Sequence, residues 1–124
     1  MKLDHLAVWT RDIDRLAAFW QETFAAEVGA VYESRNQVGF RSRFVTLPGG
    51  LRLELMASPA RAAPEPLDSI GLAHIALSFG GDAAVDAAAE RLAAHLVAKP
   101  RRSGDGYYEA IIRDPDGNLV ELVA

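Results

Sequence analysis

In the stretch Gly71-Leu72-Ala73-His74-Ile75-Ala76-Leu77, a histidine lies in an apolar run, and the same pattern occurs earlier as Leu3-Asp4-His5-Leu6-Ala7-Val8. Two glutamates recur in a similar way, Glu54 in one apolar run and Glu121 in another. The interval from His5 to His74 is nearly equal to the interval from Glu54 to Glu121. The sequence therefore indicates that one structural unit is present twice.

A helix signal follows each histidine run. Apolar residues recur at the spacing of one face of an amphipathic helix in both halves. They are Ile13, Leu16, Ala17, Trp20 and Phe24 in the first half, and Val85, Ala88, Ala89, Leu92 and Leu96 in the second. We expect Thr10 or Asp12 to cap the first helix and Asp82 to cap the second.

A turn precedes each glutamate strand: Pro48-Gly49-Gly50 before Glu54, and Pro115-Asp116-Gly117 before Glu121. Proline presets φ and glycine supplies positive φ, so both sequences are typical of turns. The remaining strands are expected at residues 28–35 and 40–47 in the first half, and at 99–102 and 107–113 in the second.

The resulting order is β-α-β-β-β, repeated once, which predicts an α+β fold. We expect a single domain, residues 1–124, since its length suits one hydrophobic core. Its first module covers residues 1–57 and its second covers 70–124. Residues 58–69 are rich in proline and alanine and are expected to form the linker between the modules.

The composition excludes several classes of protein. The chain has no cysteine, which rules out disulfides, thiolate zinc sites and cysteine nucleophiles. A net charge of −4 argues against a general nucleic-acid surface. No apolar run is long enough to span a bilayer, and the first residues lack the apolar core of a signal peptide. We therefore expect a cytoplasmic protein that binds neither nucleic acid nor membrane.

The two histidines and two glutamates have the chemistry of a metal site. A carboxylate in the middle of an apolar strand needs solvent or a partner, because an unpaired buried charge is costly. Imidazole and carboxylate donors suit a divalent ion of Zn, Ni, Co, Mn or Fe. Taken singly, each residue has a plainer interpretation: a histidine hydrogen-bonded in the core, or a glutamate on a solvated face.

On these stretches, and on Asp114-Pro115-Asp116-Gly117-Asn118-Leu119-Val120-Glu121-Leu122, the chain resembles the vicinal oxygen chelate (VOC) superfamily. This superfamily includes glyoxalase I, bleomycin-resistance proteins and extradiol dioxygenases. The resemblance implies two β-α-β-β-β modules that form a half-open barrel around a metal. It also implies that the metal ligands of glyoxalase I correspond to His5, Glu54, His74 and Glu121.

The implied activity is that of a glyoxalase I-like lyase or isomerase, acting on a small vicinal-oxygen substrate through a metal-stabilised enediolate-type intermediate. Glu121 would be the catalytic base and Glu54 the second candidate. Trp9 occupies the position of an arginine, and Ser58 that of an asparagine, in bacterial glyoxalase I; both changes argue against a glutathione thioester substrate. Trp9, Arg43 and Tyr107 are candidate substrate-binding residues.

Two other functions stay open. A non-catalytic protein of the bleomycin-resistance type would bind an antibiotic or metabolite. An extradiol dioxygenase is a further alternative, although Ile111 stands where that family has a tyrosine. The partners implied by the resemblance are a small-molecule substrate and a second copy of the chain in a homodimer.

Overall fold

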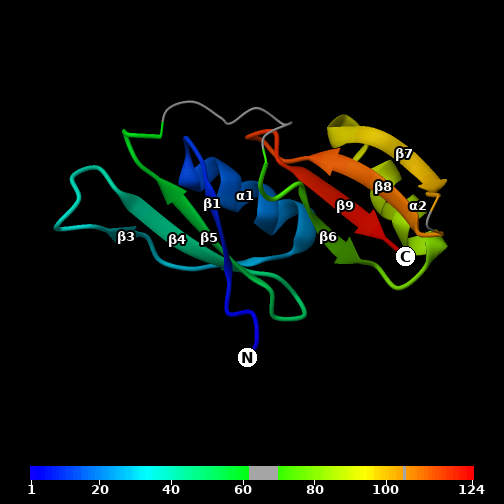
Figure 1. The fold of residues 1–124 in the computed structure, drawn as a ribbon, viewed down its shortest axis with the longest axis horizontal. Coiled ribbons are helices and arrows are strands. Elements are labelled where there is room, and N and C mark those ends of the chain that lie inside the picture. Colours follow the sequence, from blue (N-terminus) through cyan, green and yellow to red (C-terminus); the bar gives the residue numbers. More distant parts are fainter. Residues whose placement is uncertain (62–69, 105) are drawn as a thin grey trace. The chain divides into compact units, whose positions relative to one another are not determined.

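Each half of the chain builds its own β-sheet and helix, in the order that the sequence predicts (Figure 1). The structure is a computed structural model that describes residues 1–61, 70–104 and 106–124. The chain divides into two units, unit 1 (Met1–Glu65) and unit 2 (Pro66–Ala124). Most of the expected linker, residues 62–69, lies outside the described residues.

The described part of unit 1 contains a five-stranded sheet and one helix. Its elements are β1 (Leu6–Trp9), α1 (Ile13–Phe24), β2 (Glu27–Val28), β3 (Tyr32–Glu33), β4 (Arg41–Thr46) and β5 (Arg52–Ala57). The sheet has the strand order β1-β5-β4-β2, and β3 also pairs with β4. The first and last strands, β1 and β5, are parallel, and the other pairings are antiparallel.

The core of unit 1 lies between α1 and one face of the sheet. The side chains of Leu16 and Trp20 on α1 are buried, as are those of Leu53 and Leu55 on β5. Alternate residues of β5 are less buried, because successive side chains of a strand point to opposite faces. The Asp12 carboxylate accepts the backbone N–H groups at the start of α1, so Asp12 is the cap of this helix.

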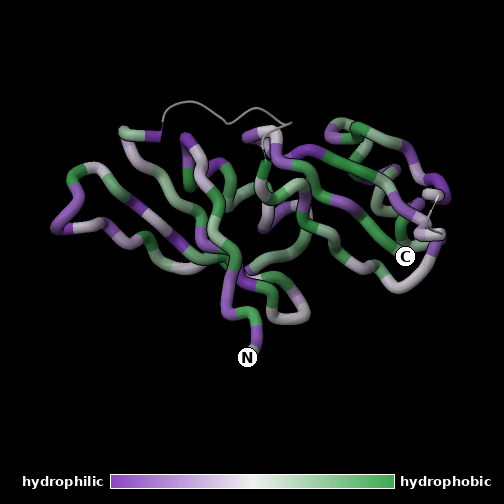
Figure 2. Tube along the Cα trace, in the orientation of Figure 1, coloured by the Kyte–Doolittle hydropathy of each residue, from purple (hydrophilic) through white to green (hydrophobic). Residues whose placement is uncertain are grey.

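Unit 2 repeats this plan with a four-stranded sheet. Its elements are β6 (His74–Ser78), α2 (Asp82–Arg91), the short 3-10 helix η1 (Ala93–His95), β7 (Leu96–Arg102), β8 (Tyr108–Arg113) and β9 (Leu119–Val123). The strand order is β6-β9-β8-β7, again with the first and last strands parallel. Buried and more exposed residues tend to alternate along these strands. Hydrophobic residues predominate in β9 (Figure 2), and the buried set includes Val85, Ile112, Val120 and Leu122.

The prediction of one continuous strand at residues 28–35 is wrong. Two short strands, β2 and β3, replace it, and both pair with β4. The chain passes very close to β4 at Gly29, whose N–H donates to the Phe44 carbonyl at 2.8 Å. A Cβ at Gly29 would lie 3.1 Å from the same oxygen, so glycine permits this close approach.

The predicted end and cap of the second helix are also wrong. Helix α2 ends at Arg91, and Leu96 belongs to β7, where it pairs with Ile112. Strand pairing therefore overrides the helical spacing of Leu96. Gly81 occupies the N-cap without a side-chain bond, and Asp82 is the first helical residue. A carboxylate in the first turn still interacts favourably with the helix dipole.

The α+β class and the repeated β-α-β-β-β order are confirmed. In unit 1, β2 and β3 together take the place of one strand. The half-open barrel and the module boundaries stay predictions. No helix in the described part of the chain is long and apolar enough to cross a membrane.

Candidate functional site

The first histidine and the first glutamate meet on one face of the unit 1 sheet. Ala7 of β1 is the register partner of Glu54 on β5. His5 precedes Ala7 by two positions, so its side chain points to the same face. The His5 Nε2 and Glu54 Oε2 atoms are 3.7 Å apart. The small Ala7 side chain leaves room for the imidazole to reach Glu54.

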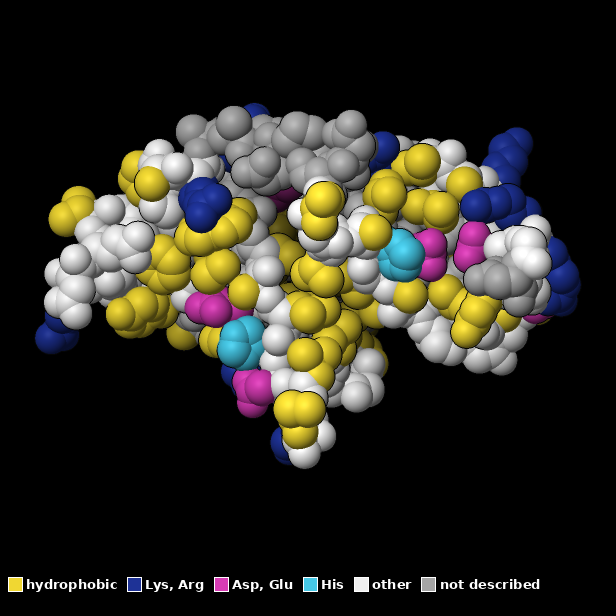
Figure 3. Space-filling view, in the orientation of Figure 1, with side chains coloured by type: hydrophobic (Ala, Val, Ile, Leu, Met, Phe, Trp, Pro, Cys, Tyr) yellow, Lys and Arg dark blue, Asp and Glu magenta, His cyan; other side chains and the backbone are white. Residues whose placement is uncertain are grey.

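The second pair repeats this arrangement in unit 2. Ala76 of β6 is the register partner of Glu121 on β9, and His74 precedes Ala76 by two positions. The His74 Nε2 and Glu121 Oε2 atoms are 3.3 Å apart. Figure 3 shows a histidine beside an acidic side chain on each unit. The duplication therefore extends to the register that brings each histidine to its glutamate.

Each glutamate lies between buried apolar neighbours on its strand. Leu53 and Leu55 flank Glu54, and Val120 and Leu122 flank Glu121; all four are fully buried. The glutamate side chains themselves keep 21% and 18% of their exposure. They point to the sheet face opposite the helix, where they are accessible to a ligand.

The two separations fit a pair of metal ligands. Nitrogen and oxygen donors bind a zinc-like ion at about 2.0–2.2 Å, so two of them at a tetrahedral angle are about 3.3–3.6 Å apart. The observed 3.7 and 3.3 Å are close to this value and longer than an ordinary N–H···O hydrogen bond. Each pair supplies two donors, and no group of three or more ligating side chains occurs among the described residues.

Additional residues surround His5 that the sequence analysis did not identify. The His5 Nδ1 atom lies 2.7 Å from the Asp4 Oδ1 atom. This hydrogen bond holds the pKa of the Asp4 carboxyl below its usual value, and the nearby Arg52 charge acts in the same direction. The Phe44 ring meets the imidazole edge to face, with ring centroids 5.3 Å apart. Asp4 could have been identified from the sequence, because it is adjacent to His5. Phe44 could be identified only from the strand register.

Trp9 lies on the same face as the first pair. It is the register partner of Met56, two residues after Glu54 on β5. Its side chain is 39% exposed and contacts the Phe40 ring edge to face at 6.2 Å. The Arg61 guanidinium carbon lies 5.1 Å from the Trp9 ring centroid. The structure thus brings this candidate substrate-binding residue to the face that carries His5 and Glu54.

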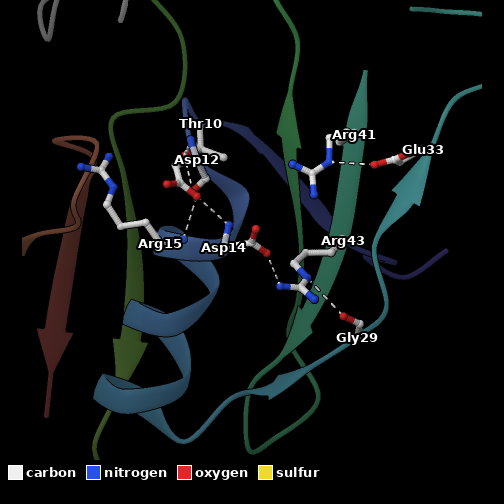
Figure 4. A network of polar contacts seen from close by, with 8 residues as sticks. All are labelled: Thr10, Asp12, Asp14, Arg15, Gly29, Glu33, Arg41 and Arg43. Carbon is white, nitrogen blue, oxygen red and sulfur yellow. Dashed lines mark hydrogen bonds and ion pairs between the residues drawn. The ribbon is translucent and has the colours of Figure 1, made fainter. Parts of the chain in front are cut away.

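Arg43 is directed elsewhere. It is the register partner of the buried Leu55, so its side chain leaves the sheet on the helix side. Its guanidinium donates to the Asp14 carboxylate of α1 at 2.7 Å and to the Gly29 carbonyl at 3.2 Å (Figure 4). The structure therefore does not bring Arg43 to Glu54, and its contacts join α1 to the sheet.

Tyr107, the third candidate substrate-binding residue, lies far from the His74–Glu121 pair of unit 2. It immediately precedes β8, and its carbonyl accepts the Ser103 N–H. The register partner of Glu121 on β8 is Ile111, four residues further on. At the rise of a β-strand this corresponds to roughly 13 Å. The structure does not bring Tyr107 to the pair of unit 2.

The aspartate that opens the last turn has a structural role that the sequence analysis did not identify. Asp114 is buried, and its Oδ1 accepts the backbone N–H groups of Asp116 and Asn118, both at 2.9 Å. Its Oδ2 accepts the Asn118 side-chain amide at 2.8 Å. Burial raises the pKa of the Asp114 carboxyl, while these hydrogen bonds oppose the rise. The turn that delivers Glu121 is thus held by one carboxylate.

Each unit has a histidine on or directly before its first strand and a glutamate on its last strand. The two copies define a protein with a duplicated β-α-β-β-β module. A family model described as "Glyoxalase/Bleomycin resistance protein/Dioxygenase superfamily" matches residues 2–122. The chain therefore belongs to the glyoxalase/bleomycin resistance protein/dioxygenase superfamily, the group that also carries the name VOC.

Solved structures share the fold at low sequence identity. A glyoxylase/bleomycin resistance protein/dioxygenase domain from Frankia sp. EAN1pec is 19% identical, with a TM-score of 0.84 over 99% of this chain and 90% of that one. A family enzyme from Burkholderia phytofirmans PsJN is 21% identical, with a TM-score of 0.72 over 99% and 98%. Glyoxalase I from Zea mays is 19% identical, with a TM-score of 0.76 over 98% of this chain.

The chain spans 44% of the length of the Zea mays glyoxalase I chain. At these identities the likenesses show a common fold. No curated protein sequence matches the chain.

Proposed function

We propose that the chain is a metal-dependent enzyme of the glyoxalase type, a lyase or isomerase that acts on a small molecule with two adjacent oxygens. The observation that supports this best is the repeated histidine–glutamate pair, with the same register offset in both units. A core histidine or a solvated glutamate has no reason to recur with its partner at matched positions. A pair of metal ligands has such a reason, because the ion needs both side chains.

The proposed ligands are His5 and Glu54 from unit 1, and His74 and Glu121 from unit 2. Together they would hold one divalent ion of Zn, Ni, Co, Mn or Fe, since imidazole and carboxylate suit all five. The two kinds of unit could come from one chain or from the two chains of a homodimer. When bound, the ion supplies a Lewis acid that stabilises negative charge on the substrate oxygens.

The chain's own residues would move the proton. We assign Glu121 as the general base that removes a proton next to the substrate carbonyl, giving an enediolate-type intermediate, and then returns it to the neighbouring carbon. Glu54 is the second candidate.

The substrate is expected to be a small molecule with an apolar or aromatic part. The exposed Trp9 ring and the Phe40 ring that it contacts offer an apolar surface on the face of the first pair. Aromatic rings prefer edge-to-face or offset contacts with such a surface. We further propose that the protein acts in the cytoplasm as a homodimer.

The test is metal analysis of protein loaded in turn with Zn, Ni, Co and Mn, followed by dialysis. We expect close to one ion per set of four ligands, and a lower content in Glu121→Gln and Glu54→Gln. Glu33→Gln is the matched control, because Glu33 is an exposed strand glutamate that pairs with Arg41. Wild-type protein that retains none of these four metals, and no iron when loaded in the same way, would refute the proposal.

A second candidate is a non-catalytic protein that binds an antibiotic or metabolite. The exposed Trp9–Phe40 pair favours it, because an apolar ligand could bind there without a metal. This candidate predicts that an aromatic ligand quenches Trp9 fluorescence equally with and without chelator. Turnover of a vicinal-oxygen substrate that the chelator abolishes would exclude it. An extradiol dioxygenase would instead consume oxygen with a catechol after iron loading.

A further inference from the structure

Four side chains of unit 1, those of Asp4, His5, Phe44 and Arg52, form a closed ring of contacts. The His5 Nδ1 atom lies 2.7 Å from the Asp4 carboxylate, and the His5 ring meets Phe44 edge to face. The Arg52 guanidinium carbon lies 4.2 Å from the Phe44 ring centroid. Arg52 also contacts Asp4, which closes the ring: its Nη1 atom lies 3.6 Å from the same Asp4 Oδ1 atom that contacts His5.

We infer that Asp4, Phe44 and Arg52 are positioning residues for His5. They hold the imidazole in the tautomer with its proton on Nδ1, so that Nε2 presents its lone pair on the side of Glu54. The inference rests on the proposed function in one respect, namely that Nε2 is the atom that would bind the metal.

The tautomer follows from hydrogen-bond chemistry. An ionised carboxylate can only accept hydrogen bonds, so the proton between Asp4 and His5 must be carried by Nδ1. In a neutral imidazole the other nitrogen, Nε2, then has no proton. At 3.7 Å from Glu54, Nε2 is beyond hydrogen-bond distance of that carboxylate. A histidine that donates from one nitrogen to a carboxylate is fixed in its tautomer and ring orientation, so its other nitrogen is presented to a ligand.

The other two members of the ring restrict how this contact can break. Arg52 attracts the same Asp4 oxygen that accepts from His5, which opposes rotation of the carboxylate away from the ring. A guanidinium over an aromatic face is itself attracted to the ring quadrupole, so Arg52 is held by Phe44. The Phe44 ring in turn limits rotation of the His5 ring.

Unit 2 has no equivalent ring in the described part of the chain. The residue before His74 is Ala73, where unit 1 has Asp4. The register partner of Glu121 on β8 is Ile111, where Glu54 has Phe44. Leu119 stands two residues before Glu121, as Arg52 stands before Glu54. Since aliphatic residues stand at the positions of Asp4, Phe44 and Arg52, the two halves of the duplication hold their histidines differently.

The first test observes the tautomer in metal-free protein. Long-range 1H–15N spectra at a pH above 8 distinguish a proton on Nδ1 from one on Nε2, and the His5→Gln spectrum assigns the His5 signals. We expect the Nδ1–H form in the wild type and a marked shift towards Nε2–H in Asp4→Ala. Asp4→Asn should be intermediate, because its amide oxygen can still accept.

Glu33→Ala is the matched control for this test. Glu33 is 72% exposed and Asp4 is 73% exposed, and each lies beside an arginine, but Glu33 contacts Arg41 rather than a histidine. It should leave the His5 spectrum unchanged. An unchanged His5 tautomer in Asp4→Ala, or an Nε2–H form in the wild type, overturns the inference.

The second test separates this inference from the proposed function. If the wild type binds cobalt, Asp4→Ala should weaken binding by about tenfold or more, the usual effect of losing such a partner. Arg52→Met should weaken it less, and Glu33→Ala should not. Equal cobalt affinity in Asp4→Ala and wild type overturns the inference. If the wild type binds no metal, the proposed function fails, and the tautomer result still decides the role of Asp4.

Discussion

The turn between β8 and β9 allows a quantitative prediction, because one buried carboxylate holds it together. The substitution is Asp114→Ala. It removes the acceptors of three hydrogen bonds, two from the backbone N–H groups of Asp116 and Asn118 and one from the Asn118 side chain. Asp114 is 5% exposed, so water replaces these contacts only in part.

The expected loss follows from these contacts. A hydrogen bond to a charged acceptor contributes roughly 1.5 kcal/mol or somewhat more to stability, so three contribute roughly 4–5 kcal/mol. The cost of burying the carboxylate, which raises the pKa of Asp114, offsets part of this gain. We therefore expect Asp114→Ala to lower the free energy of unfolding of unit 2 by about 2–3 kcal/mol.

The assay is urea unfolding followed by far-UV circular dichroism, since both tryptophans lie in unit 1. Asp114→Asn is the matched control. Its remaining Oδ1 can still accept from both backbone groups, so it should lose only about 1 kcal/mol. A loss below about 0.5 kcal/mol in Asp114→Ala would refute the account of the turn.

A comparison of the wild type with Asp114→Asn should also show a pH dependence of stability. Burial raises the folded-state pKa of Asp114 above its value in the unfolded chain. The carboxyl therefore contributes most to stability below the unfolded pKa, and this contribution is lost as pH rises through the folded pKa. Relative to Asp114→Asn, the wild type should lose stability as pH rises from about 3 towards neutrality. A gain over that range would contradict the sign.

Two other predictions concern α1. Ala25 ends the helix with φ of 54°, and Ala25→Gly should raise the free energy of unfolding of unit 1 by about 0.5–1 kcal/mol in urea, because glycine adopts this conformation without strain; a destabilised variant would contradict this. Arg43→Met should cost about 0.5–1 kcal/mol by losing its contact with Asp14, which is partly exposed to solvent, yet leave metal content unchanged. Reduced metal content in a folded Arg43→Met protein would contradict the placement of Arg43 on the helix side of the sheet, away from Glu54.

The sequence predicted the repeated order of elements because periodicity is a local property. The 3.6-residue spacing around Leu16 and the alternation around Glu54 each report directly which face is buried. The errors occur where a distant strand decides the local structure. The interruption at Gly29 depends on the Phe44 carbonyl, and the strand conformation of Leu96 depends on its pairing with Ile112.

The candidate site shows the same division. Matched positions in the repeat were enough to select His5 and Glu54 together, and the strand register accounts for why they meet. The side of the sheet on which Arg43 lies was not evident from its charge, although its spacing from Val45 could have indicated the helix side. The contact between Phe44 and His5 depends on three strands in register, which no single segment specifies.

The parallel pairing of first and last strands also affects how each unit folds. In unit 1, β1 and β5 are separated by every other element, and in unit 2 the same holds for β6 and β9. Closing such long loops costs chain entropy before the pairing compensates for it, so these contacts form slowly. Each histidine therefore meets its glutamate only when the unit is complete. A ligand that needs both side chains would bind finished units alone, and would stabilise them against unfolding by mass action.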